Sequence, residues 1–169
     1  KLKDGFNCIK LKIGVDWKAE KEIIKQLRAK FPKDELELRV DANGGFSVEE
    51  AKTVLQVLAD LEIHSIEQPI KAGQISEMAE LCKNSPTPIA LDEELIGVLN
   101  FEDKKELLEK INPQFIILKP SLVGGFSGTD EWISFAESKK IGWWITSALE
   151  SNIGLNAIAQ YTFTKNEIG

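Results

Sequence analysis

The sequence predicts an α/β fold in which about six parallel strands alternate with helices. Short apolar segments recur along the chain, and each is followed by a segment with apolar residues at helical spacing. Such alternation requires a parallel sheet with helical crossovers. Charged residues 25 to 29 positions apart end five of the segments, which favours a (β/α)-barrel over a doubly wound sheet. These residues are Lys12, Asp41, Glu67, Asp92 and Lys119.

Two patterns mark the strands. Residues 8–14 alternate in polarity, with Lys10 and Lys12 on the face opposite Ile9 and Leu11. Residues 115–118 are apolar on both faces, as in a buried parallel strand. The predicted strands cover residues 8–14, 35–40, 63–67, 89–92, 115–119 and 142–147.

Capping residues and apolar stripes mark the helices. Asp16 can cap the first helix, which Pro32 ends, and Ser47 with Glu50 forms a capping box for the second. The glycines within residues 124–128 predict a flexible loop. The predicted helices cover residues 17–31, 48–61, 74–82, 102–110, 129–139 and 153–161.

Three acids at successive strand ends are candidate metal ligands. In a barrel the carboxyl ends of the strands converge, which would bring Asp41, Glu67 and Asp92 together. Clustered carboxylates repel one another unless a cation neutralises them, and oxygen ligands without His or Cys suit Mg²⁺. Each acid alone also fits a turn or a helix cap. The single histidine, His64, lies early in its strand and is predicted to be structural.

Two lysines flank the acids in the predicted barrel order. Lys12 precedes them and Lys119 follows them. A lysine beside a bound dication is driven towards its neutral form, which can act as a general base. A metal-bound carboxylate substrate has an acidified α-carbon, because the metal stabilises the enediolate. The alternative is that Lys10 and Lys12 are solvated charges on an edge strand, but Lys119 ends an apolar strand and fits that alternative poorly.

Composition limits the class of protein. The chain has 169 residues, 43% of them hydrophobic, which is enough for one globular domain. A net charge of −6 argues against a nucleic-acid surface, and no apolar run approaches the roughly 20 residues that span a membrane. Cys8 and Cys82 match no metal spacing, so we expect buried free thiols in a reducing compartment, by default the cytoplasm.

Five short motifs, in this order and spacing, resemble the enolase superfamily. With lysines on two strands they are most similar to its muconate-lactonizing subgroup, and residues 118–125 and 147–154 resemble the o-succinylbenzoate synthase family. N-succinylamino acid racemases, dipeptide epimerases and cycloisomerases share this kind of site. The last loops lack the Asp-x-Asp pair of dipeptide epimerases, which ranks that alternative lower. The motifs are Lys10-Leu11-Lys12, Asp41-Ala42-Asn43, Ile66-Glu67-Gln68-Pro69, Leu91-Asp92-Glu93 and Leu118-Lys119-Pro120.

The resemblance implies the main chemical roles. Asp41, Glu67 and Asp92 would bind Mg²⁺, with Mn²⁺ able to substitute. Lys12 would remove the α-proton of a small carboxylate substrate and help the hydroxyl leave as water. Lys119 would stabilise the enediolate from the other face.

Supporting roles are implied for five further residues. Lys10 would assist Lys12 and the substrate carboxylate, and Asn43 and Glu93 would orient the metal ligands. The loops at Gly124 and Ser147 would hold the succinyl tail of the substrate through backbone N–H groups and a hydroxyl.

The resemblance also implies an activity and a domain. The activity is Mg²⁺-dependent syn dehydration of 2-succinyl-6-hydroxy-2,4-cyclohexadiene-1-carboxylate to 2-succinylbenzoate, a lyase step of menaquinone biosynthesis. A racemase or epimerase, and a non-catalytic metal-binding barrel fragment, are the alternatives. Residues 1–169 would be an incomplete C-terminal (β/α)8-type TIM barrel, without the N-terminal α+β capping domain and the terminal strands. Barrels of this family often form homo-oligomers, and neither nucleic acid nor membrane is an expected partner.

Overall fold

Six parallel strands form one sheet in the computed structural model, which describes residues 2–165. The strands pair in chain order, so each is hydrogen-bonded to the next. They are β1 (Cys8–Lys12), β2 (Glu37–Asp41), β3 (Ser65–Glu67), β4 (Ile89–Leu91), β5 (Phe115–Leu118) and β6 (Gly142–Ile145).

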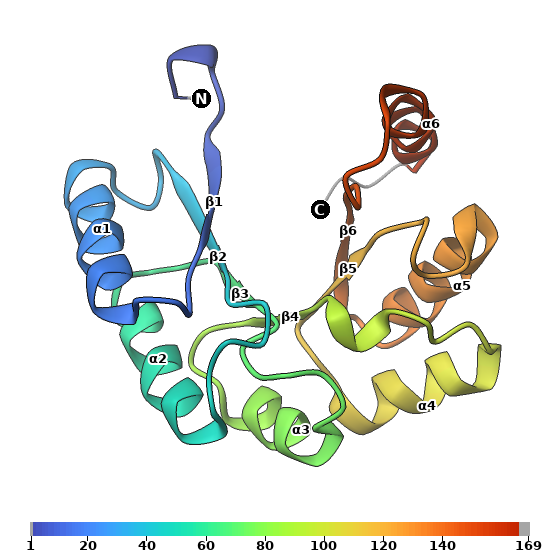
Figure 1. The fold of residues 1–169 in the computed structure, drawn as a ribbon, viewed down its shortest axis with the longest axis horizontal. Helices are drawn as coiled ribbons and strands as arrows, with labels where there is room; N and C mark the ends of the chain where they lie inside the picture. Colours follow the sequence, from blue (N-terminus) through green and yellow to red (C-terminus); the bar gives the residue numbers. More distant parts are fainter. Residues whose placement is uncertain (1, 166–169) are drawn as a thin grey trace.

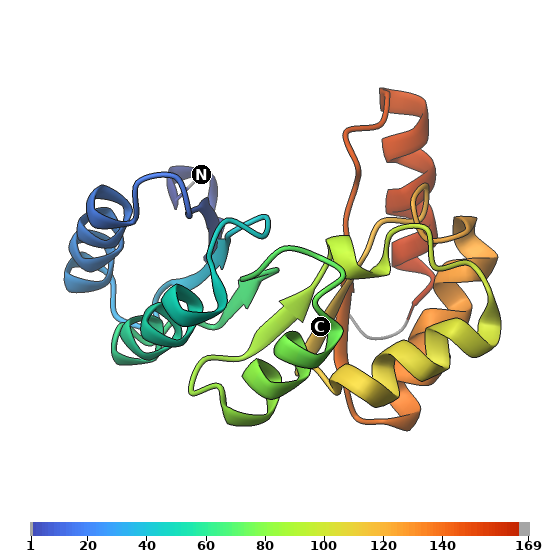
Figure 2. The ribbon, with the colours of Figure 1, turned by 60° about the horizontal axis from the view of Figure 1, so that its bottom comes forward.

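A helix follows every strand and lies on the outside of the arc that the sheet describes (Figure 1). The turned view shows the strands on the inner side of the same arc (Figure 2). The arrangement is a half-barrel, which confirms the predicted α/β fold as part of a TIM barrel. The helices are α1 (Trp17–Lys30), α2 (Val48–Asp60), α3 (Ile75–Asn84), α4 (Phe101–Ile111), α5 (Gly125–Ser138) and α6 (Asn152–Phe163), with short 3-10 turns at η1 (Leu2–Asp4) and η2 (Glu93–Leu95).

The predicted caps start the first two helices. The Asp16 carboxylate accepts a hydrogen bond from the N–H of Ala19 at α1. The Ser47 hydroxyl and the Glu50 carboxylate form the reciprocal capping box of α2. None of the described helices is both long and apolar enough to cross a membrane.

Apolar side chains between the sheet and the helices form the core. Fully buried Leu38 and Ile66 come from the strands, and Leu58 and Met78 from the helices. Burial of such side chains contributes about 25 cal/mol per Å² of apolar surface. The core therefore holds α1 to α5 against the outer side of the sheet, and the inner side is left for polar groups.

Aromatic rings and one guanidinium group fill part of the inner side. The Arg39 guanidinium lies 4.3 Å from the centroid of the Trp144 ring, and that ring lies 5.5 Å from Phe115. The His64 ring lies 5.0 Å from Phe115, so this histidine packs near the strand starts, away from the acids, as predicted. Arg39 is two residues before Asp41 on the same face of β2, so this layer lies beneath the strand ends.

Two expectations were wrong. The predicted flexible loop at residues 124–128 is the beginning of α5, with Gly124 in the left-handed conformation as its N-cap. This position of the helix requires glycine, because a Cβ added at Gly128 would lie 2.4 Å from the Val123 carbonyl oxygen. Cys82 is a buried free thiol as expected, but Cys8 is exposed.

We expect Gly128→Ala to destabilise the protein. Alanine favours a helix by up to about 1 kcal/mol over glycine, but the clash with Val123 resembles overpacking, which costs about 1–3 kcal/mol. Urea unfolding measures the net loss. Exposed Ser127, one position earlier in α5, is the control, since Ser127→Ala should leave stability unchanged or slightly raised. Equal stability of the two variants would contradict the close packing at Gly128.

Candidate active site

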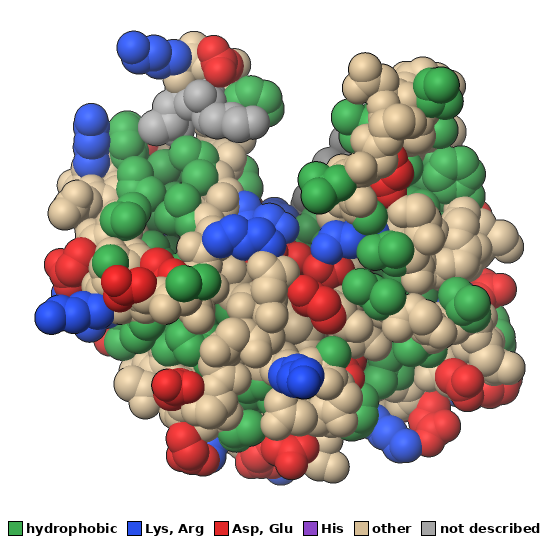
Figure 3. All heavy atoms as spheres, viewed as in Figure 1, with side chains coloured by type: hydrophobic (Ala, Val, Ile, Leu, Met, Phe, Trp, Pro, Cys, Tyr) green, Lys and Arg blue, Asp and Glu red, His purple; other side chains and the backbone are tan. Residues whose placement is uncertain are grey.

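The sheet register brings the predicted residues together at one end of the half-barrel. Lys12 pairs directly with Asp41, and Asp41 with Glu67, across three neighbouring strands. Asp92 and Lys119 follow immediately after β4 and β5. Figure 3 shows basic and acidic side chains gathered in the hollow between the β1 end and the β6–α6 end of the half-barrel.

Each acid is buried and paired with a lysine. The exposed fraction is 1% for Asp41 and 2% for both Glu67 and Asp92. The Lys12 Nζ lies 2.5 Å from Asp41 Oδ2, and the Lys10 Nζ lies 2.5 Å from Glu67 Oε2. Lys119 pairs with Asp92, and its Nζ also lies 3.9 Å from Glu67 Oε1. The three lysines thus neutralise the three acids.

The surroundings of Glu67, the central acid, disfavour its ionised form. Burial, followed by the adjacent Asp92 carboxyl, raises the pKa of Glu67 to about 8, although Lys10 opposes the shift and Asp41 adds to it. Burial of Lys10 acts to lower its pKa, but the hydrogen bond and charge of Glu67, with the charge of Asp41, outweigh it and raise the pKa. Burial therefore disfavours the ionised form of Glu67 even though Lys10 lies beside it.

The acids fit a hard divalent cation by donor type, burial and charge. The Oε1 atom of Glu67 is buried and has no hydrogen-bond partner in the described residues, so a cation could use it without breaking a hydrogen bond. Within residues 2–165, no three His, Cys, Asp or Glu side chains are already grouped around one metal position. The carboxylates are instead engaged by lysines, and a cation would have to take the place of the ammonium groups.

Asn43 and Glu93 connect the site to its surroundings. The Asn43 Oδ1 accepts a hydrogen bond of 2.6 Å from Lys12 Nζ, and its Nδ2 donates one of 2.9 Å to Glu93 Oε1. The Asn43 N–H donates to Asp41 Oδ1 at 3.0 Å. Asn43 adopts a left-handed conformation with φ 43°, which the turn after β2 requires. Both residues therefore lie beside the acids, where the sequence placed them.

The two loops predicted to hold a substrate tail lie at the same end of the sheet. Gly124 caps α5, and the Gly125 N–H donates to the Pro120 carbonyl, so this N–H is already paired. The Ser147 side chain, in the loop after β6, makes no hydrogen bond with another described residue. The structure brings neither Gly124 nor Ser147 into contact with the acids.

Sequence reasoning missed Glu150, which links these loops. Its Oε1 accepts a hydrogen bond from the Ser121 hydroxyl, and its Oε2 accepts one of 2.6 Å from the Ala148 N–H. The Ser121 hydrogen bond is the main reason that the pKa of Glu150 is lowered, and the charge of Lys119 contributes less. Glu150 stands inside a motif that the sequence singled out, but the motif does not indicate that its side chain turns towards Ser121.

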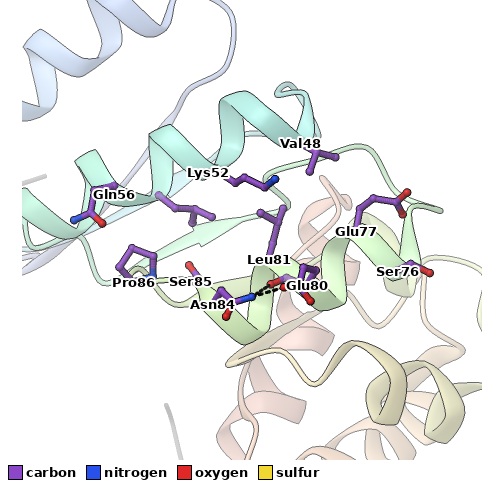
Figure 4. Close-up of a pocket in the computed structure, with 11 residues that line it drawn as sticks. Val48, Lys52, Gln56, Ser76, Glu77, Glu80, Leu81, Asn84, Ser85 and Pro86 are labelled. Atoms are coloured by element: carbon purple, nitrogen blue, oxygen red, sulfur yellow. Dashed lines mark hydrogen bonds between the residues drawn. The ribbon is translucent and has the colours of Figure 1, made fainter.

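A separate groove of about 550 Å³ lies between α2 and α3. Figure 4 shows Val48, Lys52 and Leu81 among its lining residues. None of the predicted site residues lines it, so it is not part of the candidate active site.

A parallel half-barrel with acids and lysines at its strand ends defines the class of α/β-barrel domains that carry their functional groups at the carboxyl ends of the strands. Residues 1–168 match the Enolase C-terminal domain-like family, and the chain belongs to that family. This confirms the predicted superfamily.

Similar proteins within the family have several activities. The chain is 55% identical over 163 residues, 96% of its length, to o-succinylbenzoate synthase of Desulfotalea psychrophila, and covers 44% of that protein. It is 33% identical to N-succinylamino acid racemase of Thermus thermophilus, with 90% of the chain and 39% of that protein covered. L-Ala-D/L-Glu epimerase of Bacillus subtilis is 29% identical, with 99% and 45% covered. The chain thus spans less than half the length of these relatives.

Solved structures agree with the fold. MenC from Desulfotalea psychrophila superimposes with a TM-score of 0.92 at 51% identity, covering 99% of this chain and 47% of that one. The muconate lactonizing enzyme from Pseudomonas putida gives a TM-score of 0.87 at 28% identity, covering 96% and 44%. The half-barrel therefore corresponds to part of larger enolase-type chains.

We expect the metal-free protein to lose stability as the pH rises from 4.5, the ordinary pKa of a glutamate, to about 8. In this window the folded state keeps the Glu67 proton that the unfolded chain has released, so stability falls by up to about 1.4 kcal/mol per pH unit. Urea unfolding with a chelator, at several pH values, measures the slope for the wild type and for Glu67→Gln.

The comparison of variants isolates Glu67 from other titrating groups. Glu67→Gln should flatten the pH dependence in this window, while Glu77→Gln, at an exposed position of α3, should keep the wild-type slope. Parallel pH profiles for the wild type and Glu67→Gln would show that Glu67 does not carry the effect.

Proposed function

We propose that the chain is part of a Mg²⁺-dependent o-succinylbenzoate synthase, a carbon–oxygen lyase of menaquinone biosynthesis. The observation that carries the proposal is 55% identity to such an enzyme over 96% of the chain. The ion-paired lysines and acids at the strand ends support it. Residues 1–169 would then form part of the enolase-type barrel domain of that enzyme, with a capping domain elsewhere in the natural polypeptide.

The proposed metal ligands are Asp41, Glu67 and Asp92, which would hold Mg²⁺ or, as a substitute, Mn²⁺. The ion, when bound, would neutralise the acids and bind the substrate carboxylate, which makes the α-proton easier to remove. Lys10, hydrogen-bonded to Glu67 and 3.5 Å from Asp41, would add positive charge beside that carboxylate.

Lys12 is the proposed base. Its side chain is 66% exposed and is held by Asp41 and Asn43, so it can turn from its partners towards a substrate. The neutral amine would take the proton from C1 of the cyclohexadiene ring and return it to the C6 hydroxyl, which leaves as water from the same face. The C–H and C–O bonds break, a ring C=C bond forms, and 2-succinylbenzoate and one water result.

Lys119 is proposed to act through its charge. Its side chain is only 19% exposed and lies between Asp92 and Glu67, on the other side of the acids from Lys12. A held ammonium there would stabilise negative charge that develops on the substrate. Asn43 and Glu93 would orient Lys12 and Asp41, and the loops at Gly124 and Ser147 would contact the succinyl tail.

A racemase of N-succinylamino acids is the second candidate. The 33% identical relative carries that name, and lysines on both sides of a substrate could each exchange an α-proton. A dipeptide epimerase ranks lower because the loop at residues 147–152 lacks an Asp-x-Asp pair. A non-catalytic metal-binding module gives no reason for charged residues at five strand ends.

The proposal predicts metal-dependent turnover of 2-succinyl-6-hydroxy-2,4-cyclohexadiene-1-carboxylate by the natural polypeptide that carries residues 1–169. The diene absorbance should disappear with Mg²⁺ and persist with a chelator. Solvent deuterium exchange into N-succinylamino acids, without loss of the diene, would contradict the synthase and favour the racemase.

We expect Lys12→Met to lower kcat by about 10²–10⁴-fold, since it removes the general base. Mg²⁺ binding should persist or tighten, because Lys12 no longer competes for Asp41. Exposed Lys18 provides the matched control, and Lys18→Met should retain wild-type kcat. Wild-type kcat in Lys12→Met would remove Lys12 from the mechanism.

Lys119→Met should also lose activity while its fold and Mg²⁺ binding persist.

A further inference from the structure

Gln68, the residue after Glu67, has a fully buried side chain in which both polar atoms are paired. Its Oε1 accepts hydrogen bonds from the N–H groups of Asp92 at 3.2 Å and Glu94 at 3.3 Å. Its Nε2 donates to the Ile70 carbonyl and to Glu94 Oε2, both at 3.1 Å. One amide thus ties the end of β3 to the turn after β4.

The backbone of Gln68 extends the same connection to the turn after β2. Its N–H donates to the Ala90 carbonyl at 2.9 Å, and its carbonyl accepts from the Gly44 N–H at 2.7 Å. Its φ of 40° lies in the left-handed region, which is uncommon and strained for a glutamine. A strained residue with every polar group satisfied is held by its surroundings, so its position is well determined.

Glu94 completes the connection. It is 7% exposed, and its Oε1 accepts a hydrogen bond of 2.8 Å from the Gly73 N–H. The pair therefore spans from the loop after β3 to η2, directly behind Glu67 and Asp92. Neither Gln68 nor Glu94 contacts the lysines that pair with the acids.

We propose that Gln68 and Glu94 are positioning residues that fix the separation of Glu67 and Asp92 and thereby set the affinity for Mg²⁺. This inference rests on the proposed metal site. Two neighbouring ligands bind one cation well only if their backbones hold a fixed spacing, and outer-shell partners typically change metal affinity by about 10–100-fold. Gln68 holds the Asp92 N–H by a hydrogen bond and Glu67 by a peptide bond, so it acts on both ligands.

The alternative is that the pair only stabilises the fold. Removal of this buried amide leaves two N–H groups, the Ile70 carbonyl and the Glu94 Oε2 atom without a partner, and such a loss would lower stability anywhere in the protein. A comparison of Mg²⁺ affinity with stability separates the two roles, because a purely structural residue lowers stability without changing the affinity of the folded state.

The test is Mg²⁺ titration calorimetry of Gln68→Met, which keeps side-chain size and removes all four hydrogen bonds. The Kd for Mg²⁺ should rise at least about tenfold. Thr87→Val is the matched control. Thr87 lies just before the start of β4, at the end of the strand far from the acids, and its buried hydroxyl donates a 2.7 Å hydrogen bond to the Leu55 carbonyl. This variant should lose stability and keep the wild-type Kd. Hydrogen exchange of the backbone N–H groups of Asp92 and Glu94 should be faster in Gln68→Met than in the wild type and unchanged in Thr87→Val.

Two further variants complete the design. The exchange Gln68→Glu with Glu94→Gln keeps the net charge and reverses the donor between the two side chains, but it leaves the Ile70 carbonyl without its donor, so its Kd should lie between those of Gln68→Met and the wild type. Gln68→Asn, which keeps an amide but shortens its reach, should raise the Kd and takes the place of Gln68→Met if that variant does not fold.

The outcomes separate the two proposals. A wild-type protein that binds no Mg²⁺ overturns the proposed metal site and this inference with it. Wild-type binding with an unchanged Kd in Gln68→Met or Gln68→Asn overturns the positioning role alone. An equal rise of the Kd in Thr87→Val also overturns it, because the effect would then follow general stability.

Discussion

Repulsion among three buried carboxylates is the constraint on which the site depends. Parallel pairing in register places Asp41 and Glu67 side by side, and Asp92 comes immediately after the next strand, β4. Burial denies these charges solvation, and the cost appears in Glu67, whose pKa rises to about 8. Only nearby positive charge offsets this cost. The flanking strands supply it as lysines, so the electrostatics of the acids dictate what the neighbouring strands must carry.

The lysines differ in ways that follow from their positions in the sheet. Lys12 ends the edge strand β1 and is mostly exposed, whereas Lys119 follows the inner strand β5 and is mostly buried. The Lys12 ammonium can turn away because water solvates it, and Lys10, 3.5 Å from Asp41, still offsets the charge of that buried carboxylate. A buried ion pair resists separation, since each charge would be left without a partner. This difference in exposure is the reason that we propose Lys12 as the base and Lys119 as a fixed charge.

Strand periodicity in the sequence predicted which residues lie at the strand ends, but the sequence did not predict the side-chain hydrogen bonds between those residues and their neighbours. Residues at strand ends converge in any parallel barrel, so Asp41, Glu67, Asp92 and both lysines could be placed together. Gln68 stands in a recognised motif, but its positioning role could not be predicted, because its partners Asp92 and Glu94 come from the next βα unit and leave no local pattern. Gly128 suggested a loop because glycine has a weak helix propensity, but α5 has glycine there because a Cβ would clash with the Val123 carbonyl. The direct pairing of each acid with a lysine was also not expected.

That pairing bears on how a lysine can serve as a base here. An ammonium group that neutralises a buried carboxylate holds its proton firmly and cannot accept another. If another cation neutralises the acids, the lysine loses its partner and faces a like charge, and both changes favour the neutral amine. We therefore expect metal affinity and base strength to be coupled through the same carboxylates. Residues such as Gln68, which fix the spacing of those carboxylates, would then influence proton transfer without contacting the substrate.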